Sequence, residues 1–73
     1  MFQLGRVAEA EKELAIAAGS DEPDGVVLEH WGDALAKLGR RDEALSAWRR
    51  AETAFQKSKE AGKLSIVRAK LVK

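Results

Sequence analysis

The 73-residue sequence contains no cysteine, no tyrosine, one proline and one histidine. The absence of cysteine excludes disulfide bonds and thiolate metal sites. No run of about 18 apolar residues is present, and no charged-then-apolar segment of the secretory kind, so we expect no membrane contact. The composition therefore predicts a soluble, cytoplasmic chain.

The sequence also lacks the residue patterns of common enzymes. It has no glycine-rich phosphate loop and no H-E-x-x-H motif, and His30 is the single histidine. Glu29, His30 and Asp33 could be drawn as a metal or acid-base cluster. However, His30 directly follows Glu29 and would point about 100° away from it on a helix. We therefore predict no enzymatic activity, no catalytic residue, no metal site and no cofactor.

Aromatic residues are scarce, at 5% of the chain, and alanine, leucine and valine make up most of the 45% that is hydrophobic. These side chains favour closely packed helices over strands. Apolar residues recur three or four positions apart in four segments, which is the period of an amphipathic helix. We therefore predict an all-α fold of four helices without a sheet.

Caps and helix breakers define the first two helices. The first is expected between Gly5 and Gly19, and the second over residues 26–38, with Asp24 as N-cap and Gly39 as C-cap. The segment 19–25 contains the only proline and has low helix propensity, which predicts a linker. The expected apolar stripes are Val7, Ala10, Leu14 and Ala17 on the first helix and Leu28, Trp31, Leu35 and Leu38 on the second.

Two further helices are expected in the second half of the chain. The third should begin near Arg41 and fade between residues 58 and 62, where Gly62 predicts a break before the fourth. One continuous helix through Gly62 is the alternative. The inward residues are expected to be Ala44, Trp48, Ala51 and Phe55 on the third helix and Leu64, Val67 and Leu71 on the fourth.

An internal repeat relates the two halves of the chain. The tripeptide Leu4-Gly5-Arg6 recurs 34 positions later as Leu38-Gly39-Arg40. Glu9, Ala10 and Ala17 recur at the same offset as Glu43, Ala44 and Ala51. A period of about 34 residues with helical patterning is typical of stacked helix-turn-helix units, which bury their apolar faces against one another.

The second unit resembles one tetratricopeptide repeat, whose signature is W-x₂-L-G-x₂-Y…A-x₃-F…P. The residues that carry the resemblance are Leu28, Trp31, Gly32, Leu35, Ala44, Trp48 and Ala51. Leucine replaces a common aromatic at positions 28 and 35, and Gln56 replaces the usual proline. The resemblance implies an antiparallel α-solenoid fragment with half a repeat over 1–23, a full repeat over 24–56 and a capping helix over 57–73. It also implies that Gly32 and Ala44 allow close helix approach, while Trp31 and Trp48 fill the space between repeats.

The resemblance further implies a protein-protein interaction scaffold that binds a partner protein or peptide on its concave face. The first helix of each pair forms most of that face. Glu29 and Asp33 favour a basic or mixed peptide and argue against a clamp for a terminal carboxylate. The alternative is that these are solvent-facing charges, with Asp33 and Lys37 paired one turn apart. The implied peptide-binding residues are Val26, Glu29, His30, Asp33 and Lys37.

Two other functions remain as alternatives. Residues 57–73 carry six basic residues against one acid, whereas residues 1–35 carry two against eight. The basic half, with several nearby arginines, suggests an RNA-binding helical repeat, although the acidic half and the lack of interleaved aromatics disfavour it. The second alternative is a self-associating fragment with no activity of its own. The first helix lacks most of its partner, so Val7, Leu14 and Ile16 are expected to be partly exposed, and a homodimer through this helix or by helix exchange is a hypothesis.

Overall fold

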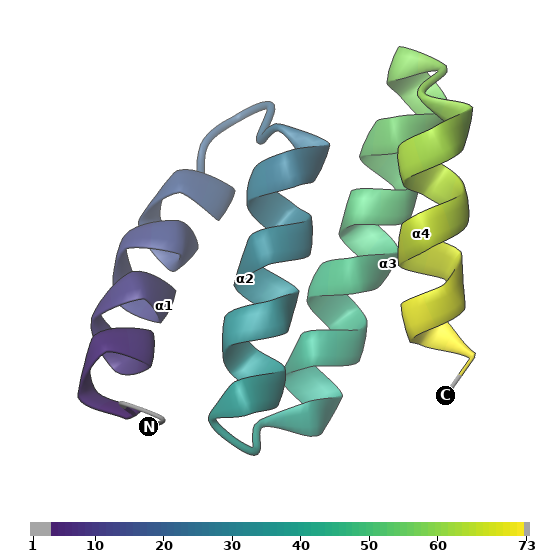
Figure 1. The fold of residues 1–73 in the computed structure, drawn as a ribbon. Helices are drawn as coiled ribbons and strands as arrows, with labels where there is room; N and C mark the ends of the chain where they lie inside the picture. The colour runs from purple at the N-terminus through teal and green to yellow at the C-terminus, as the bar shows by residue number, and fades with distance from the viewer. Residues whose placement is uncertain (1–3, 73) are drawn as a thin grey trace.

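A computed structural model describes residues 4–72, which form four α-helices and, within that range, no strand. The helices are α1 (Leu4–Ala18), α2 (Gly25–Lys37), α3 (Arg41–Ser58) and α4 (Ala61–Leu71). They follow one another in chain order, and each runs antiparallel to the one before it (Figure 1). The predicted all-α fold of four helices is therefore confirmed. No helix among residues 4–72 combines the length and apolar character that crossing a bilayer requires.

The C-terminal end of α1 and both ends of α2 lie within one residue of the predicted positions, with Leu38 rather than Gly39 as the C-cap of α2. Helix α1 ends at Ala18, directly before Gly19. The side chain of Asp24 accepts a hydrogen bond of 3.1 Å from the backbone N–H of Val26 and so caps α2. At the other end Gly39 has a φ of 80°, which turns the chain so that the Arg40 N–H donates to the Leu35 carbonyl at 2.9 Å.

The break between α3 and α4 lies at Lys59, not at Gly62. Lys59 adopts a left-handed backbone with φ 59° and ψ 36°. The Glu60 N–H then donates to the Phe55 carbonyl at 3.0 Å, which repeats the closure of α2. Gly62 is instead the second residue of α4, and α3 ends at Ser58, at the start of the segment where it was expected to fade. The two helices are thus separate, and the segment predicted as a capping helix from residue 57 begins inside α3.

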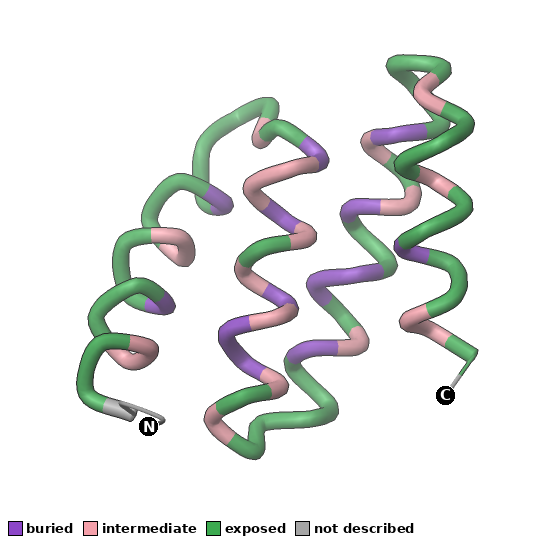
Figure 2. The backbone as a smooth tube through the Cα atoms, viewed as in Figure 1, coloured by how far each residue is buried: buried purple, intermediate pink, exposed green. Residues whose placement is uncertain are grey.

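The core lies on both sides of α3. Its four predicted inward residues, Ala44, Trp48, Ala51 and Phe55, are each at most 8% exposed. Figure 2 shows buried positions along α2 and α3, which lie side by side. Helix α2 contributes the buried Leu28 and Leu35, and α4 contributes Val67. Trp31 and Leu38, also predicted to point inward, are only half-buried.

Helices α2 and α3 approach most closely at two glycines. A Cβ atom added to Gly32 would lie 2.3 Å from Nε1 of Trp48, and one added to Gly25 would lie 2.6 Å from Cε1 of Phe55. Both distances are far shorter than any van der Waals contact between such atoms. The expectation that Gly32 permits close helix approach is therefore confirmed.

Helix α1 buries a different face from the one predicted. Ala10 and Ala17 are exposed, whereas Glu11 and Ala18 are 8% and 0% exposed. The face of α1 that packs against α2 is thus rotated by about one residue from the apolar stripe. This is because Glu11, whose carboxylate has internal hydrogen-bond partners, occupies one position of the packed face. The partial exposure expected at Val7, Leu14 and Ile16 is confirmed, and Ile16 is 79% exposed.

Candidate functional site

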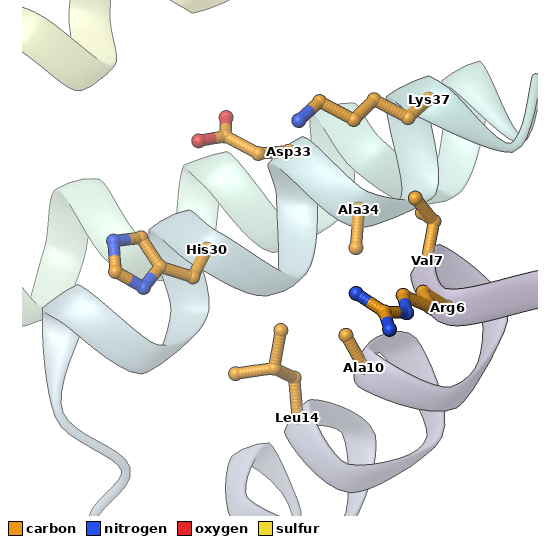
Figure 3. A pocket seen from close by; sticks show the side chains of 8 residues that line it. All are labelled: Arg6, Val7, Ala10, Leu14, His30, Asp33, Ala34 and Lys37. Carbon is orange, nitrogen blue, oxygen red and sulfur yellow. The ribbon is translucent and has the colours of Figure 1, made fainter. Parts of the chain in front are cut away.

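A groove of about 350 Å³ lies between α1 and α2 (Figure 3). Its floor is apolar and comes from both helices, and charged side chains and an imidazole form its rim. We call it the α1–α2 groove. Its floor is Val7, Ala10, Leu14 and Ala34, and its rim is Arg6, His30, Asp33 and Lys37.

The groove contains three of the five residues predicted to bind a peptide. His30, Asp33 and Lys37 line it, whereas Val26 and Glu29 do not. Val26 is half-buried and packs against the hydrophobic core. Glu29 is turned toward α4. The rotation of about 100° between neighbouring helical residues thus separates Glu29 from His30, the side chains that could have been drawn as one cluster. No three metal-binding side chains converge within residues 4–72.

The two acids of the predicted site are occupied by a lysine from α4. Nζ of Lys70 lies 2.8 Å from Oε2 of Glu29 and 2.9 and 3.0 Å from the two carboxylate oxygens of Asp33. Nε1 of Trp48 also donates to Oδ1 of Asp33 at 3.2 Å. Asp33 therefore pairs with Lys70, and within the described residues it has no ion pair to Lys37. Glu29 and Asp33 therefore hold α4 against α2. Their carboxylates are already occupied by Lys70 and are not free to bind the basic peptide expected from the sequence.

The pKa of Lys70 reflects these partners. Burial of the side chain acts to lower its pKa. Hydrogen bonds to Glu29 and Asp33, together with the charges of these carboxylates, act in the opposite direction and outweigh burial, so the pKa lies above the ordinary value for lysine. Lys70 thus holds its proton more tightly in the folded chain than in the unfolded chain.

The stability of the chain is therefore expected to depend on pH through Lys70. Because the folded pKa is raised, this contribution is fully present below the unfolded pKa of about 10.4 and is lost as pH rises through the folded value. Between pH 9 and 12 the free energy of unfolding of the natural chain should therefore fall more steeply than that of Lys70→Met. Urea unfolding at several pH values would measure this difference.

The matched control for this titration is Lys63→Met. Lys63 also pairs with a carboxylate, Glu60, at 3.3 Å, but both side chains are well exposed, at 49% and 39%. An exposed pair contributes little, so this variant should keep the pH dependence of the natural chain. If the free energy of unfolding falls with pH equally in the natural chain and in Lys70→Met, the ion pairs of Lys70 do not stabilise the fold.

The wall of the groove formed by α1 is held in place through Glu11. This side chain accepts a hydrogen bond of 2.9 Å from Nε1 of Trp31 and one of 3.1 Å from Nη1 of Arg40. Arg50 adds a second link, because its Nη2 donates to the Ala18 carbonyl at 2.8 Å and its guanidinium lies 5.8 Å from the ring centroid of Trp31. These contacts join the C-terminal half of α1 to α2 and α3.

Several basic residues of the second half of the chain are paired with carboxylates. Arg40 binds Glu11 and Glu43, and its hydrogen bond holds the pKa of the Glu43 carboxyl below its ordinary value. Arg68 lies 2.9 Å from Glu52. With Lys63 and Lys70, four cations of this half are paired with carboxylates. By contrast, neither Arg6 nor Lys37 at the rim of the groove is held by an acidic side chain within residues 4–72.

A second groove, of about 530 Å³, lies between the linker and α3. Acidic side chains of the linker form one wall, and Arg50 and Lys57 of α3 stand on the other. Its walls therefore carry both signs of charge, and Arg50 is already engaged by Ala18 and Trp31. Residues 21–24 contribute much of the lining, so this groove depends on loop conformation more than the α1–α2 groove does.

A scan against protein-family models and searches of curated proteins and of solved structures gave no match. The function must therefore be inferred from the geometry of the groove and from the internal repeat.

Proposed function

We propose that the chain is a tetratricopeptide-like recognition module that binds a partner protein or peptide in the α1–α2 groove and catalyses no reaction. The observation that carries this proposal is the uncovered apolar floor. Ala10 is exposed, and Val7 and Leu14 are only half-buried, although all three lie on the apolar stripe of α1. A partner that covered these side chains would remove apolar surface from water.

The charges at the rim change the expected ligand from a basic peptide to an acidic or mixed one. Asp33 is already neutralised by Lys70. Arg6 and Lys37 carry positive charge without an acidic partner in residues 4–72, and His30 adds a donor nearby. Complementary charge at the rim speeds association and selects among partners, whereas the apolar floor supplies most of the affinity.

Nucleic-acid binding is less well supported by the same charges. Four cations of the second half of the chain are paired with carboxylates. Each such pair would have to be broken before the cation could neutralise a phosphate, which reduces the counterion release that drives this kind of binding. Trp48 is 8% exposed, and the guanidinium of Arg50 already lies over the half-buried ring of Trp31, so neither indole is a free stacking surface.

A displayed library of random peptides, selected against the immobilised chain, would test the proposal. Peptides should be enriched by the natural chain and lost on Ala10→Glu, which places a charge and a longer side chain on the floor of the groove. Ser46→Glu, at an exposed position of α3, is the matched control and should retain the same peptides.

The same protein would then be titrated with labelled single-stranded RNA over a range of salt concentrations. Weak binding is expected. Two results would overturn the proposal, namely a selection that enriches no peptide above background, or tight RNA binding whose affinity falls steeply with salt.

A further inference from the structure

We propose that the ligand of the α1–α2 groove is an acidic amphipathic α-helix, which lies on α1 and α2 as α2 itself lies on α3 and α4. This inference rests on the proposed function and specifies the partner. The internal repeat supports it, because one half of the chain shows what covers the surface that the other half leaves open.

The 34-residue repeat places the apolar stripe of α1 on the buried face of α3. The three matched pairs are Ala10 with Ala44, Leu14 with Trp48, and Ala17 with Ala51. On α3 these residues are 0%, 8% and 0% exposed. Helix α2 packs on this face, where Gly32 lies directly against Trp48. On α1 the equivalent face is uncovered, and Ala10 and Ala17 are exposed.

Helix α4 completes the comparison as the counterpart of α2. Its apolar residues Leu64, Val67 and Leu71 repeat the spacing of Leu28, Trp31 and Leu35 at an offset of 36 residues. Both helices also begin at that offset, at Gly25 and Ala61. The pair α3–α4 therefore corresponds to the pair α1–α2. The element that α3 and α4 bind is a helix, α2, and not an extended strand.

Charge complementarity specifies the polar side of this helix. Helix α2 carries two acids four positions apart, Glu29 and Asp33, and presents them to Lys70 of α4. The α1–α2 groove has Arg6 on one wall and Lys37 on the other, both without acidic partners within residues 4–72. A helix with an apolar stripe and one or two acids beside it would satisfy the floor and the rim together.

The sequence of α2 is itself a suitable probe. A blocked peptide of residues 24–38 would be prepared with a side-chain staple on its solvent face, because an unsupported helix of this length is marginal in water. It would be titrated into the isotope-labelled full chain while backbone amide signals are followed. We expect shifts at Ala10, Leu14 and Ala34. The variant Ala10→Glu of the full chain should reduce the affinity at least about tenfold, and Ser46→Glu should leave it unchanged.

Two altered peptides separate charge from helicity. Reversing both acids, with Glu29→Lys and Asp33→Lys in the peptide, should weaken binding about tenfold at low salt and by less at high salt. An unstapled peptide with His30→Pro should bind much more weakly than an unstapled peptide of the natural sequence, because proline breaks the helix without altering the acids. If either the charge-reversed peptide or the proline peptide binds as tightly as its counterpart of natural sequence, the inference is overturned.

Other outcomes distinguish this inference from the proposed function. If library-selected ligands bind the groove but the stapled helix does not, the helical ligand is wrong and peptide recognition stands. If neither binds, both fail. Shifts at the same residues that depend on protein concentration alone would identify a second copy of the chain as the occupant. Shifts confined to α3 and α4 would show that the peptide replaces the chain's own α2, and either result would overturn the inference.

Discussion

Replacing Gly32 with alanine is expected to lower the free energy of unfolding by about 2 kcal/mol. The new Cβ would lie 2.3 Å from Nε1 and 2.4 Å from Cδ1 of Trp48. This indole is 8% exposed and donates to Asp33, so it cannot move aside without losing packing and a hydrogen bond. The higher helix propensity of alanine, about 1 kcal/mol relative to glycine, offsets only part of the clash. For a chain of this size the melting temperature should fall by roughly 8 to 16 °C.

Gly62→Ala is the matched control for this substitution. Gly62 also lies within a helix, but a Cβ atom there would meet no neighbouring atom within 4 Å. This variant should be as stable as the natural chain or more stable, by up to about 1 kcal/mol. Urea unfolding followed by circular dichroism would compare the three proteins. If Gly32→Ala unfolds at the same urea concentration as Gly62→Ala, α2 and α3 do not approach each other as described.

Local sequence signals were sufficient to predict the helices and two of their three turns. Asp24 caps the start of α2 as expected, and Gly39, directly after the C-cap Leu38, turns the chain at its end; both act through hydrogen bonds that span at most five residues. The third turn was misplaced because its left-handed residue is Lys59, which carries no signal for that conformation. Gly62, the expected breaker, is accommodated in α4. A glycine predicts a turn only when no better-placed residue closes the preceding helix.

The polar contacts of the site could not be predicted from local spacing. Asp33 was expected to pair with Lys37 one turn away, yet its partner is Lys70, 37 positions along the chain. The repeat did contain one usable signal. Glu11 aligns with Leu45, which packs against the core, so a carboxylate stands where the other unit has an apolar residue. Such a residue is rarely buried without a partner, and its position indicates an internal hydrogen-bond acceptor.

Removing that carboxylate with Glu11→Ala is expected to cost about 2 kcal/mol of unfolding free energy. Glu11 is 8% exposed and accepts hydrogen bonds from Nε1 of Trp31 and Nη1 of Arg40. The alanine variant leaves a part-buried indole N–H without its acceptor and a void beside it. Glu11→Gln keeps an oxygen for Trp31 but loses the charge that attracts Arg40, so its loss should be about half as large.

The control on the same helix is Glu13→Ala, at an exposed position, which should change stability by less than about 0.5 kcal/mol. Equal unfolding midpoints for Glu11→Ala and Glu13→Ala would contradict the role given to Glu11.

The site of the loss matters as much as its size. Glu11 joins α1 to α2 and to Arg40, whereas Gly32 joins α2 to α3, so Glu11→Ala should first increase amide hydrogen exchange in α1 and leave α3 protected. Because α1 forms one wall of the α1–α2 groove, this variant should also weaken ligand binding without contacting the ligand.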